Sequence, residues 1–236
     1  MKLLLDAGNS RLKWALLRDG ALADFGAAAH HGTPARAFAA QRWPKPDAVW
    51  IASVMGAGPD AALAAQVKET FGAAPDFARV EDGRNGLKLA YAEPARLGVD
   101  RWLQMQALWS EQREAFCVAA AGTALTFDEV DGSGHHQGGL IGAGLRAQEA
   151  AVRGSTRFAL GEALDYRGRL GTDTESCVHE AALFAALGLV ERAARRFTGR
   201  KILSGGDAPV LLRHLAGWSH RPHLVLEGLK VIACSS

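Results

Sequence analysis

Two short segments of the chain combine a glycine turn with small polar side chains between apolar stretches. The first segment reads Asp6, Ala7, Gly8, Asn9, Ser10, Arg11, Leu12 and Lys13. The second reads Ala120, Ala121, Gly122, Thr123, Ala124 and Leu125. Glycine lets the backbone turn sharply and approach a ligand closely, and Asn, Ser and Thr add hydrogen-bonding groups beside backbone N–H donors. Two such hairpins can clamp phosphate groups, although both also fit ordinary β-turns.

Charged side chains accompany the first turn. Asp6 is expected to end a buried strand, where a carboxylate can bind Mg²⁺ directly or through water while the turn holds the phosphates of a nucleotide. Lys13 adds a positive point charge to the same segment. Taken singly, Asp6 also fits a strand-ending carboxylate and Lys13 a solvated lysine, so the surrounding residues have to decide between the two interpretations.

A second charged pair, Asp100 and Arg101, follows Gly98 and Val99 at the expected start of a helix. A carboxylate can accept the proton of a hydroxyl group, and a guanidinium presents a planar set of donors to a carboxylate or phosphate. Asp is also common at helix starts as a cap. Tyr91 lies just upstream and is expected to line the same pocket.

The apolar pattern predicts the elements that position these residues in the first half of the chain. It alternates strands and helices, with helix periodicity near 3.6 residues and strands bounded by turn residues. We expect strands over residues 3–6, 12–17, 22–27 and 48–54, and helices over 34–41, 59–71 and 97–110.

The second half repeats this order, and we place the boundary near residue 112, giving domains 1–112 and 113–236. Strands are expected over 116–121, 125–130, 138–141 and 201–203, and helices over 174–197 and 228–233. Glycine clusters at 138–144 and 204–208 are expected between a strand and a helix. They fit either tight turns or places where the backbone passes close to a nucleotide.

Composition excludes several classes of protein. The 236 residues are 48% hydrophobic and 22% charged, which is typical of a globular protein. A net charge of +2 gives no strong field for nucleic acid or an anionic membrane, and no apolar run approaches the roughly 20 residues of a membrane span. Three separated cysteines predict reduced thiols, and no export signal is expected, so we predict a cytoplasmic protein without disulfides or a zinc site.

Some alternative motifs are weak. The segment from Gly56 to Ala61 fits the dinucleotide pattern G-x-G-x-x-A after an expected strand, but the rest of a Rossmann half is not evident. The sequence has neither a Walker A motif nor a G-x-S-x-G elbow. The histidine pairs at 30–31 and 135–136 are expected to be loop or surface residues rather than metal ligands.

Taken in order, these motifs resemble the type III pantothenate kinases over nearly the whole chain. The resemblance also includes the segments 138–141, 171–174, 204–206 and the ending 224–229. It implies an α/β fold of two RNase H-like domains, as in the acetate and sugar kinase/Hsp70/actin superfamily, with the nucleotide cleft between them. This fold agrees with the duplicated hairpin.

The resemblance implies that the chain phosphorylates pantothenate with ATP and Mg²⁺, giving 4'-phosphopantothenate for coenzyme A synthesis. The segment Asp6 to Lys13 and Thr123 would then bind ATP, with Asp6 serving the metal. Asp100 would take the hydroxyl proton, and pantothenate would contact Tyr91, Gly98, Val99, Asp100, Arg101 and Thr174. The family also implies a homodimer.

Two positions depart from the family pattern. Ala120 stands where the family usually has an aspartate that helps bind K⁺ or NH₄⁺, so we expect this cation site to be lost or rebuilt from backbone carbonyls or a side chain such as Asp128. Ala143 stands where the family usually has proline, which affects loop stiffness more than chemistry.

Two other functions remain open. Relatives of these kinases have been described as accessory factors for transcriptional activation, so a non-catalytic regulator is one alternative. Such a regulator would tolerate the loss of Asp6, Asp100 or Arg101, and all three are present. A dinucleotide-dependent oxidoreductase, based on the segment at Gly56, is the other alternative.

Overall fold

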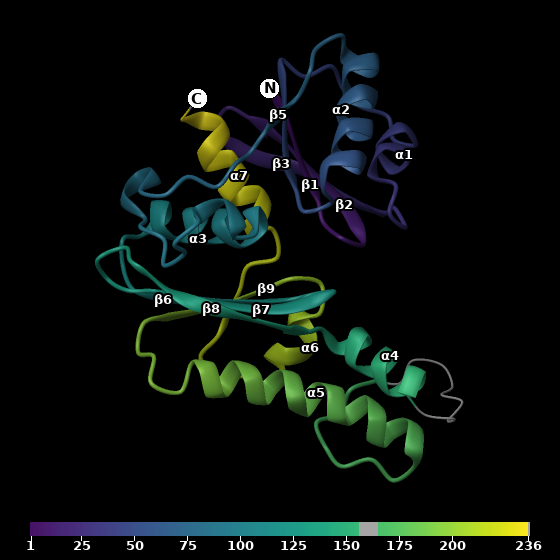
Figure 1. The fold of residues 1–236 in the computed structure, drawn as a ribbon, viewed down its shortest axis with the longest axis vertical. Helices are drawn as coiled ribbons and strands as arrows, with labels where there is room; N and C mark the ends of the chain where they lie inside the picture. Colours follow the sequence, from purple (N-terminus) through teal and green to yellow (C-terminus); the bar gives the residue numbers. More distant parts are fainter. Residues whose placement is uncertain (156–164, 236) are drawn as a thin grey trace. The chain divides into compact units, whose positions relative to one another are not determined.

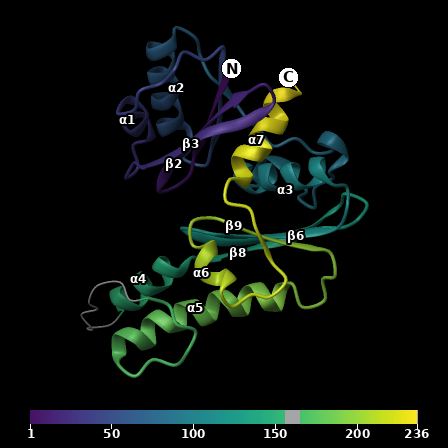
Figure 2. The ribbon, with the colours of Figure 1, turned by 180° about the vertical axis from the view of Figure 1, so that it is seen from behind.

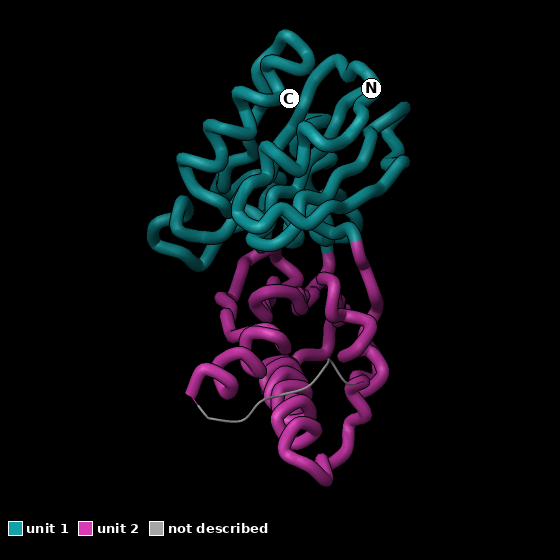
Figure 3. The backbone as a smooth tube through the Cα atoms, turned by 90° about the vertical axis from the view of Figure 1, so that its right-hand side faces the viewer, with its two compact units in different colours: residues 1–113, 223–236 teal, residues 114–222 magenta. Residues whose placement is uncertain are grey.

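The computed structural model describes residues 1–155 and 165–235. The chain forms two compact units, one of residues 1–113 and 223–236 and the other of residues 114–222 (Figure 3). The chain therefore leaves the first unit after Arg113 and returns to it at His223. The sequence interpretation had assigned the final helix to the second half, but its packing, described below, belongs to the first unit.

The first unit is built on a five-stranded mixed sheet with the order β3-β2-β1-β4-β5. Strands β1, β2 and β3 pair antiparallel, whereas β1, β4 and β5 pair parallel. The strands are β1 (Lys2–Ala7), β2 (Arg11–Arg18), β3 (Ala21–Ala29), β4 (Ala48–Ser53) and β5 (Asp76–Phe77). The helices are α1 (Pro34–Ala39), α2 (Ala57–Phe71), α3 (Val99–Glu111) and α7 (Leu224–Cys234), with 3₁₀ turns at Arg84–Gly86 and Pro94–Arg96.

Helices cover both faces of this sheet, with α1 and α2 on one side and α3 and α7 on the other (Figures 1 and 2). Successive side chains of a strand point to opposite faces. Leu3, Leu5 and Ala7 pack into one core with Phe38 of α1 and Leu63 of α2. Asp6 lies between Leu5 and Ala7 in β1, so its side chain points to the opposite face of the sheet, toward α3 and α7.

Helices α3 and α7 approach each other at a glycine. A Cβ atom on Gly228 would lie 2.0 Å from the carbonyl oxygen of Leu103 in α3, so only glycine permits this approach. Helix α7 begins at Leu224 rather than at the expected residue 228. This close packing explains why the last helix belongs to the first unit.

The second unit repeats the topology of the first, with the sheet order β10-β9-β6-β7-β8. Again three strands pair antiparallel, and β9 and β10 extend the sheet in parallel from β6. The strands are β6 (Phe116–Ala121), β7 (Ala124–Val130), β8 (His136–Ala143), β9 (Arg200–Ser204) and β10 (Ser219–His220). The helices are α4 (Leu145–Ser155), α5 (Thr174–Ala193) and α6 (Ala208–Leu212).

The second core lies between the sheet and α5, which runs along one face of the sheet (Figure 1). Ala119, Ala121, Leu125 and Phe127 face this core from β6 and β7. The opposite face carries the alternate residues, among them Ala120. None of the helices in the described residues is long and apolar enough to cross a bilayer.

The strand expected over residues 138–141 is confirmed, but the glycine cluster at 138–144 does not as a whole form a connection between a strand and a helix. Residues 138–143 belong to edge strand β8, because Gly138 to Ala143 pair with β7 in register, and only Gly144 lies between the strand and α4. The expectation for the other cluster is confirmed, since residues 205–207 connect β9 to α6. The prediction that the paired histidines are loop or surface residues was wrong for His136, which is buried in β8; it holds for His31 and His135, which are exposed, and for His30, which lies in the loop after β3 but is buried.

Candidate active site

Asp6 and Lys13 face each other across the first hairpin. They are direct register partners on β1 and β2, so their side chains share the face of the sheet toward α3 and α7. The Lys13 Nζ lies 3.4 Å from the Asp6 Oδ2, longer than the roughly 2.7–2.9 Å of a tight charge-assisted hydrogen bond. The Asp6 side chain is 7% exposed and that of Lys13 is 36% exposed. A loosely held ammonium is therefore the counter-ion of a nearly buried carboxylate.

Three influences act on the Asp6 carboxyl. Burial raises its pKa, the Lys13 ammonium lowers it, and the carboxylate of Asp100 raises it. The net shift is upward, because removing the carboxylate from water disfavours its charged form more than the lysine favours it. The repulsion also shows that the structure brings Asp6 and Asp100 near each other. A cation at this place would relieve both the burial and the repulsion.

The remaining residues of the hairpin divide between core and surface. Ala7 and Leu12 are fully buried in the core toward α1 and α2, so they can offer only backbone groups to a ligand. Asn9, Ser10 and Arg11 are exposed at the turn. The turn closes with the N–H of Gly8 donating to the Arg11 carbonyl at 3.2 Å. The ligand-binding capacity of this segment therefore lies in its turn and in Asp6 and Lys13.

Asp100 lies in the first turn of α3. Its Oδ1 accepts the backbone N–H of Arg101 at 2.9 Å, which holds the carboxylate back over the helix start. A Cβ atom on Gly98 would lie 2.7 Å from this oxygen, so a larger residue there would displace the carboxylate. The short distance to the carboxylate therefore explains why a glycine stands at position 98. Val99, the next residue, is buried.

Arg101 and Tyr91 contact each other directly. The Arg101 Nη1 donates to the Tyr91 hydroxyl at 3.0 Å, and the guanidinium carbon lies 5.9 Å from the ring centroid. Arg101 is only 3% exposed. A buried guanidinium keeps its charge and its planar donors, so this pair is suited to recognise an anionic or hydroxylated group.

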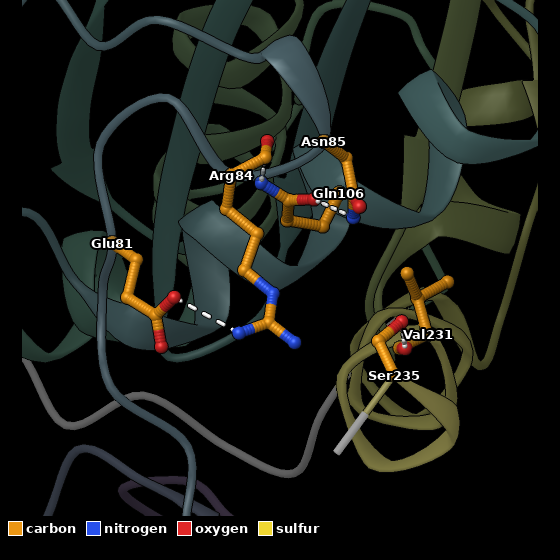
Figure 4. A network of polar contacts seen from close by, with 6 residues as sticks. All are labelled: Glu81, Arg84, Asn85, Gln106, Val231 and Ser235. Carbon is orange, nitrogen blue, oxygen red and sulfur yellow. Dashed lines mark hydrogen bonds and ion pairs between the residues drawn. The ribbon is translucent and has the colours of Figure 1, made fainter.

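A loop packed on the middle of α3 steadies this region. The Gln106 Oε1 accepts from the Asn85 side chain at 2.9 Å, and its Nε2 donates to the Arg84 carbonyl at 3.2 Å (Figure 4). Arg84 in turn bonds to Glu81 at 2.9 Å. Gln106 is fully buried, and the sequence analysis did not single it out. These contacts hold the loop that leads toward Tyr91.

In the second unit, Thr123 is exposed at the turn between β6 and β7. Glycines pack backbone against this turn from two directions. A Cβ atom on Gly144 would lie 1.9 Å from the Gly122 carbonyl oxygen, and one on Gly205, at φ +94°, would lie 2.1 Å from that of Ala121. Gly144 and Gly205, one from each glycine cluster, therefore allow their own backbone to pack directly against the turn between β6 and β7.

Thr174 is the first residue of α5 and is exposed. The helix begins with a capping box in which the Asp173 carboxylate accepts the Ser176 N–H at 2.8 Å. That bond lowers the pKa of Asp173. A pocket of about 130 Å³ lies at this helix start and is lined by residues including Asp173, Ser176, His179 and Glu180.

A buried polar cluster near the same helix was not predicted. Glu149 of α4 accepts the Tyr166 hydroxyl at 2.7 Å and pairs with His179 Nδ1 at 2.7 Å, and the Tyr166 ring stacks on the His179 ring. Glu180 accepts two backbone N–H groups of the preceding loop. The cluster ties α4 and α5 together, and no local sequence signal connects residues so far apart.

The donor set at Asp6 fits a magnesium ion shared with phosphates. Mg²⁺ is usually bound by one or two carboxylates together with substrate phosphates. The described residues contain no cluster of three or more His, Cys, Asp or Glu groups that could hold a metal by protein ligands alone. A single buried carboxylate, with a second one near, matches the shared arrangement.

The residues around Ala120 do not fit a monovalent cation held by a carboxylate. Ala120 pairs with Thr126 and has no side-chain oxygen. Asp128 lies two positions further along the same face of β7, but its Oδ1 is bonded to the Nε2 of buried His136 at 2.9 Å. We therefore assign no step to such a cation.

The sequence profile of the family described as type III pantothenate kinase matches residues 2–196. The chain belongs to this family. A type III pantothenate kinase from Laribacter hongkongensis is 36% identical over 244 residues, covering 99% of this chain and 98% of the relative. The family profile thus includes the hairpin, the start of α3 and the start of α5.

Solved structures agree on the fold. A Baf family transcriptional activator from Campylobacter jejuni superposes with a TM-score of 0.64 at 18% identity, covering 99% of this chain and 98% of the other. A 2-dehydro-3-deoxygalactonokinase from Sinorhizobium meliloti gives 0.63 at 14% identity, covering 100% and 99%. At these identities the likeness establishes the fold alone. The expected α/β fold with two repeated domains is confirmed by the two mixed five-stranded sheets.

Proposed function

We propose that this chain is an ATP:pantothenate 4'-phosphotransferase, which makes 4'-phosphopantothenate in the first step of coenzyme A biosynthesis. One observation carries the proposal: Asp6 and Lys13 pair on one face of the first sheet, within electrostatic range of Asp100, in a member of the type III pantothenate kinase family. Phosphoryl transfer depends mainly on positioning and charge neutralisation, and this group supplies charges of both signs.

The hairpin residues 6–13 bind the nucleotide in this proposal. Asp6 holds Mg²⁺, which when bound neutralises charge on the phosphates. Lys13 lies close enough to Asp6 to turn from its carboxylate toward a phosphate. The exposed turn offers the backbone and side chains of Asn9, Ser10 and Arg11. By the family resemblance, Thr123 also binds ATP.

Asp100 accepts the proton of the pantothenate hydroxyl that attacks the γ-phosphate. Its carboxylate is held by the backbone N–H of Arg101 and by the space that Gly98 leaves. Arg101 and Tyr91 bind pantothenate through the guanidinium donors and the hydroxyl. By the family resemblance, Val99 and Thr174 complete the pantothenate contacts.

Three further proposals concern location, assembly and the monovalent cation. The enzyme works in the cytoplasm and forms a homodimer; in a departure from the family pattern, it does not need K⁺ or NH₄⁺, because Ala120 brings no carboxylate. Exposed Leu140 and Ile141 on edge strand β8 offer apolar surface to a second copy. Light scattering coupled to gel filtration measures the mass in solution, and a monomer at micromolar concentration would contradict the dimer.

Release of ADP from ATP and Mg²⁺, measured with and without pantothenate, tests the function. We expect release that depends on pantothenate, with one phosphate added per ADP formed. Parallel K⁺ and Na⁺ buffers report the cation requirement. Absence of pantothenate-dependent release in both buffers would overturn the proposed reaction.

The strand directions in the first sheet argue against the dinucleotide-dependent oxidoreductase. Strands β1, β2 and β3 are antiparallel neighbours, whereas a dinucleotide-binding half is built from parallel strands. Gly56 is the residue before α2, at φ +87°, and Ser53 bonds to Asp60 across this turn. The segment is therefore accounted for as a strand-to-helix connection.

A further inference from the structure

His30 braces the turn of the first hairpin, although it lies 22 residues away from that turn. It follows β3 directly and is 3% exposed. Its ring Nε2 lies 2.7 Å from the Gly8 carbonyl oxygen, and its backbone N–H donates to the Ser10 carbonyl at 3.3 Å. One residue thus contacts both ends of the three-residue turn between β1 and β2.

The hydrogen bonds define the tautomer of this ring. The backbone N–H of Gly32 donates to His30 Nδ1 at 3.0 Å, so Nδ1 carries no proton. A carbonyl oxygen can only accept, so Nε2 carries the proton and donates it to Gly8. His30 is itself anchored, because the N–H and the hydroxyl of Thr33 both donate to its carbonyl at 2.8 and 2.7 Å. The contacts of Gly32 with the His30 ring and of Thr33 with the His30 backbone therefore fix the position of the Nε2–H group that donates to Gly8.

This brace sets the direction of the next amide. In a trans peptide the carbonyl and the following N–H point in opposite directions, and the described chain has no cis peptide. With the Gly8 carbonyl turned to His30, the N–H of Asn9 is directed away from it. Asn9 is exposed, and among the described residues no acceptor takes its N–H. Backbone N–H groups oriented in this way bind anions.

We propose that His30 is a positioning residue for the nucleotide: it fixes the peptide between Gly8 and Asn9 so that the Asn9 N–H donates to a phosphate oxygen of ATP. The inference rests on the proposed binding of ATP by residues 6–13. His30 touches no substrate in this arrangement and acts through the backbone. Its loss therefore weakens the binding of nucleotide rather than of pantothenate.

Two substitutions separate the brace from general packing. In His30→Gln the side-chain amide nitrogen takes the place of Nε2 and can still donate to Gly8. In His30→Asn the shorter side chain can accept from Gly32 but does not reach the Gly8 carbonyl. His31→Asn is the matched control, because His31 is exposed and its φ of +45° is one that Asn tolerates.

The Kd for ATP, measured by calorimetry, and the KM values for ATP and pantothenate are the readouts. We expect His30→Asn to raise the Kd and KM for ATP about tenfold with the pantothenate KM unchanged, while His30→Gln and His31→Asn stay within about threefold of wild type. Equal ATP affinity of the Asn and Gln variants would overturn the role of His30. Equal losses for ATP and pantothenate would do the same.

A measurement on the wild-type protein covers the case in which the variants do not fold. Hydrogen exchange of the Asn9 amide, followed by NMR, is expected to slow at least tenfold when MgATP is added, and unchanged exchange would overturn the inference. Wild-type turnover is measured first. If it shows no pantothenate-dependent ADP release, the proposed function and this inference both fall. Failure of the His30 tests on an active enzyme removes only the role of His30.

Discussion

Replacing Asp100 by Asn removes the proposed base while leaving its surroundings intact. Asn has nearly the same volume, and its Oδ1 can still accept the Arg101 N–H that Asp100 accepts at 2.9 Å. The start of α3 should therefore keep its conformation. We expect kcat to fall about 10²–10⁴-fold, which is the usual contribution of a general base and corresponds to about 3–5 kcal/mol in the barrier.

The same substitution should not weaken nucleotide binding. The Asp100 carboxylate raises the pKa of Asp6 by repulsion, so its removal leaves Asp6 more readily ionised. Binding of MgATP should therefore stay equal or become tighter. A loss in kcat without a loss in ATP affinity is the signature of a group that acts in the transition state.

Steady-state ADP release gives kcat and both KM values, and calorimetry gives the Kd for ATP. Glu93→Gln is the matched control, since it removes one carboxylate seven residues upstream at an exposed position. It should leave every parameter within about twofold. A kcat of Asp100→Asn within tenfold of wild type, or a loss confined to the KM for ATP, would refute the assignment of Asp100 as the base.

Four further outcomes are expected. Arg101→Lys should raise the KM for pantothenate about tenfold at unchanged KM for ATP, because lysine lacks the planar donors that reach Tyr91; an unchanged pantothenate KM would make this residue structural. Turnover in K⁺ and Na⁺ buffers should agree within about twofold, because Ala120 offers no carboxylate, and strong activation by K⁺ would contradict this. Gly228→Ala should lower the free energy of unfolding in urea by about 1–3 kcal/mol, because its Cβ would meet a carbonyl of α3 at 2.0 Å; an unshifted midpoint would argue against the close approach. Burial raises the pKa of Cys117 to about 12, so Ellman's reagent should modify only the other two cysteines until the protein is unfolded; three fast thiols would disagree.

The sequence was most informative where local chemistry decides structure. Turn residues between apolar stretches predicted both hairpins, and apolar periodicity predicted α2, α3 and α5 to within a few residues. The same signals placed Asp100 at a helix start, whereas the register that sets Asp6 opposite Lys13 came from the structure. These features depend on neighbours in the sequence, which is why a single chain suffices to predict them.

The features that were missed depend on contacts between distant residues. His30 is in a loop by local pattern, and its burial accompanies a contact with Gly8, 22 residues away. The strand expected over 138–141 extends from His136 to Ala143, because pairing with β7 takes most of the glycine cluster into it. Two-residue strands such as β5 carry too few residues to show a period. The packing of α7 on α3 likewise depends on a fit between Gly228 and a carbonyl that no local pattern encodes.

The return of the chain to its first unit has a consequence for how the protein is made. On the ribosome, residues 1–113 emerge first, but the helix that covers one face of their sheet ends only at Cys234. At about 5–20 residues per second, synthesis of the 109 residues from 114 to 222 takes roughly 5–20 s. The second unit is contiguous and can complete its fold during that interval. During that interval the first unit has an apolar face uncovered, and the residues that cover it are translated only after the second unit. Removal of α7 should therefore damage the fold of residues 1–113.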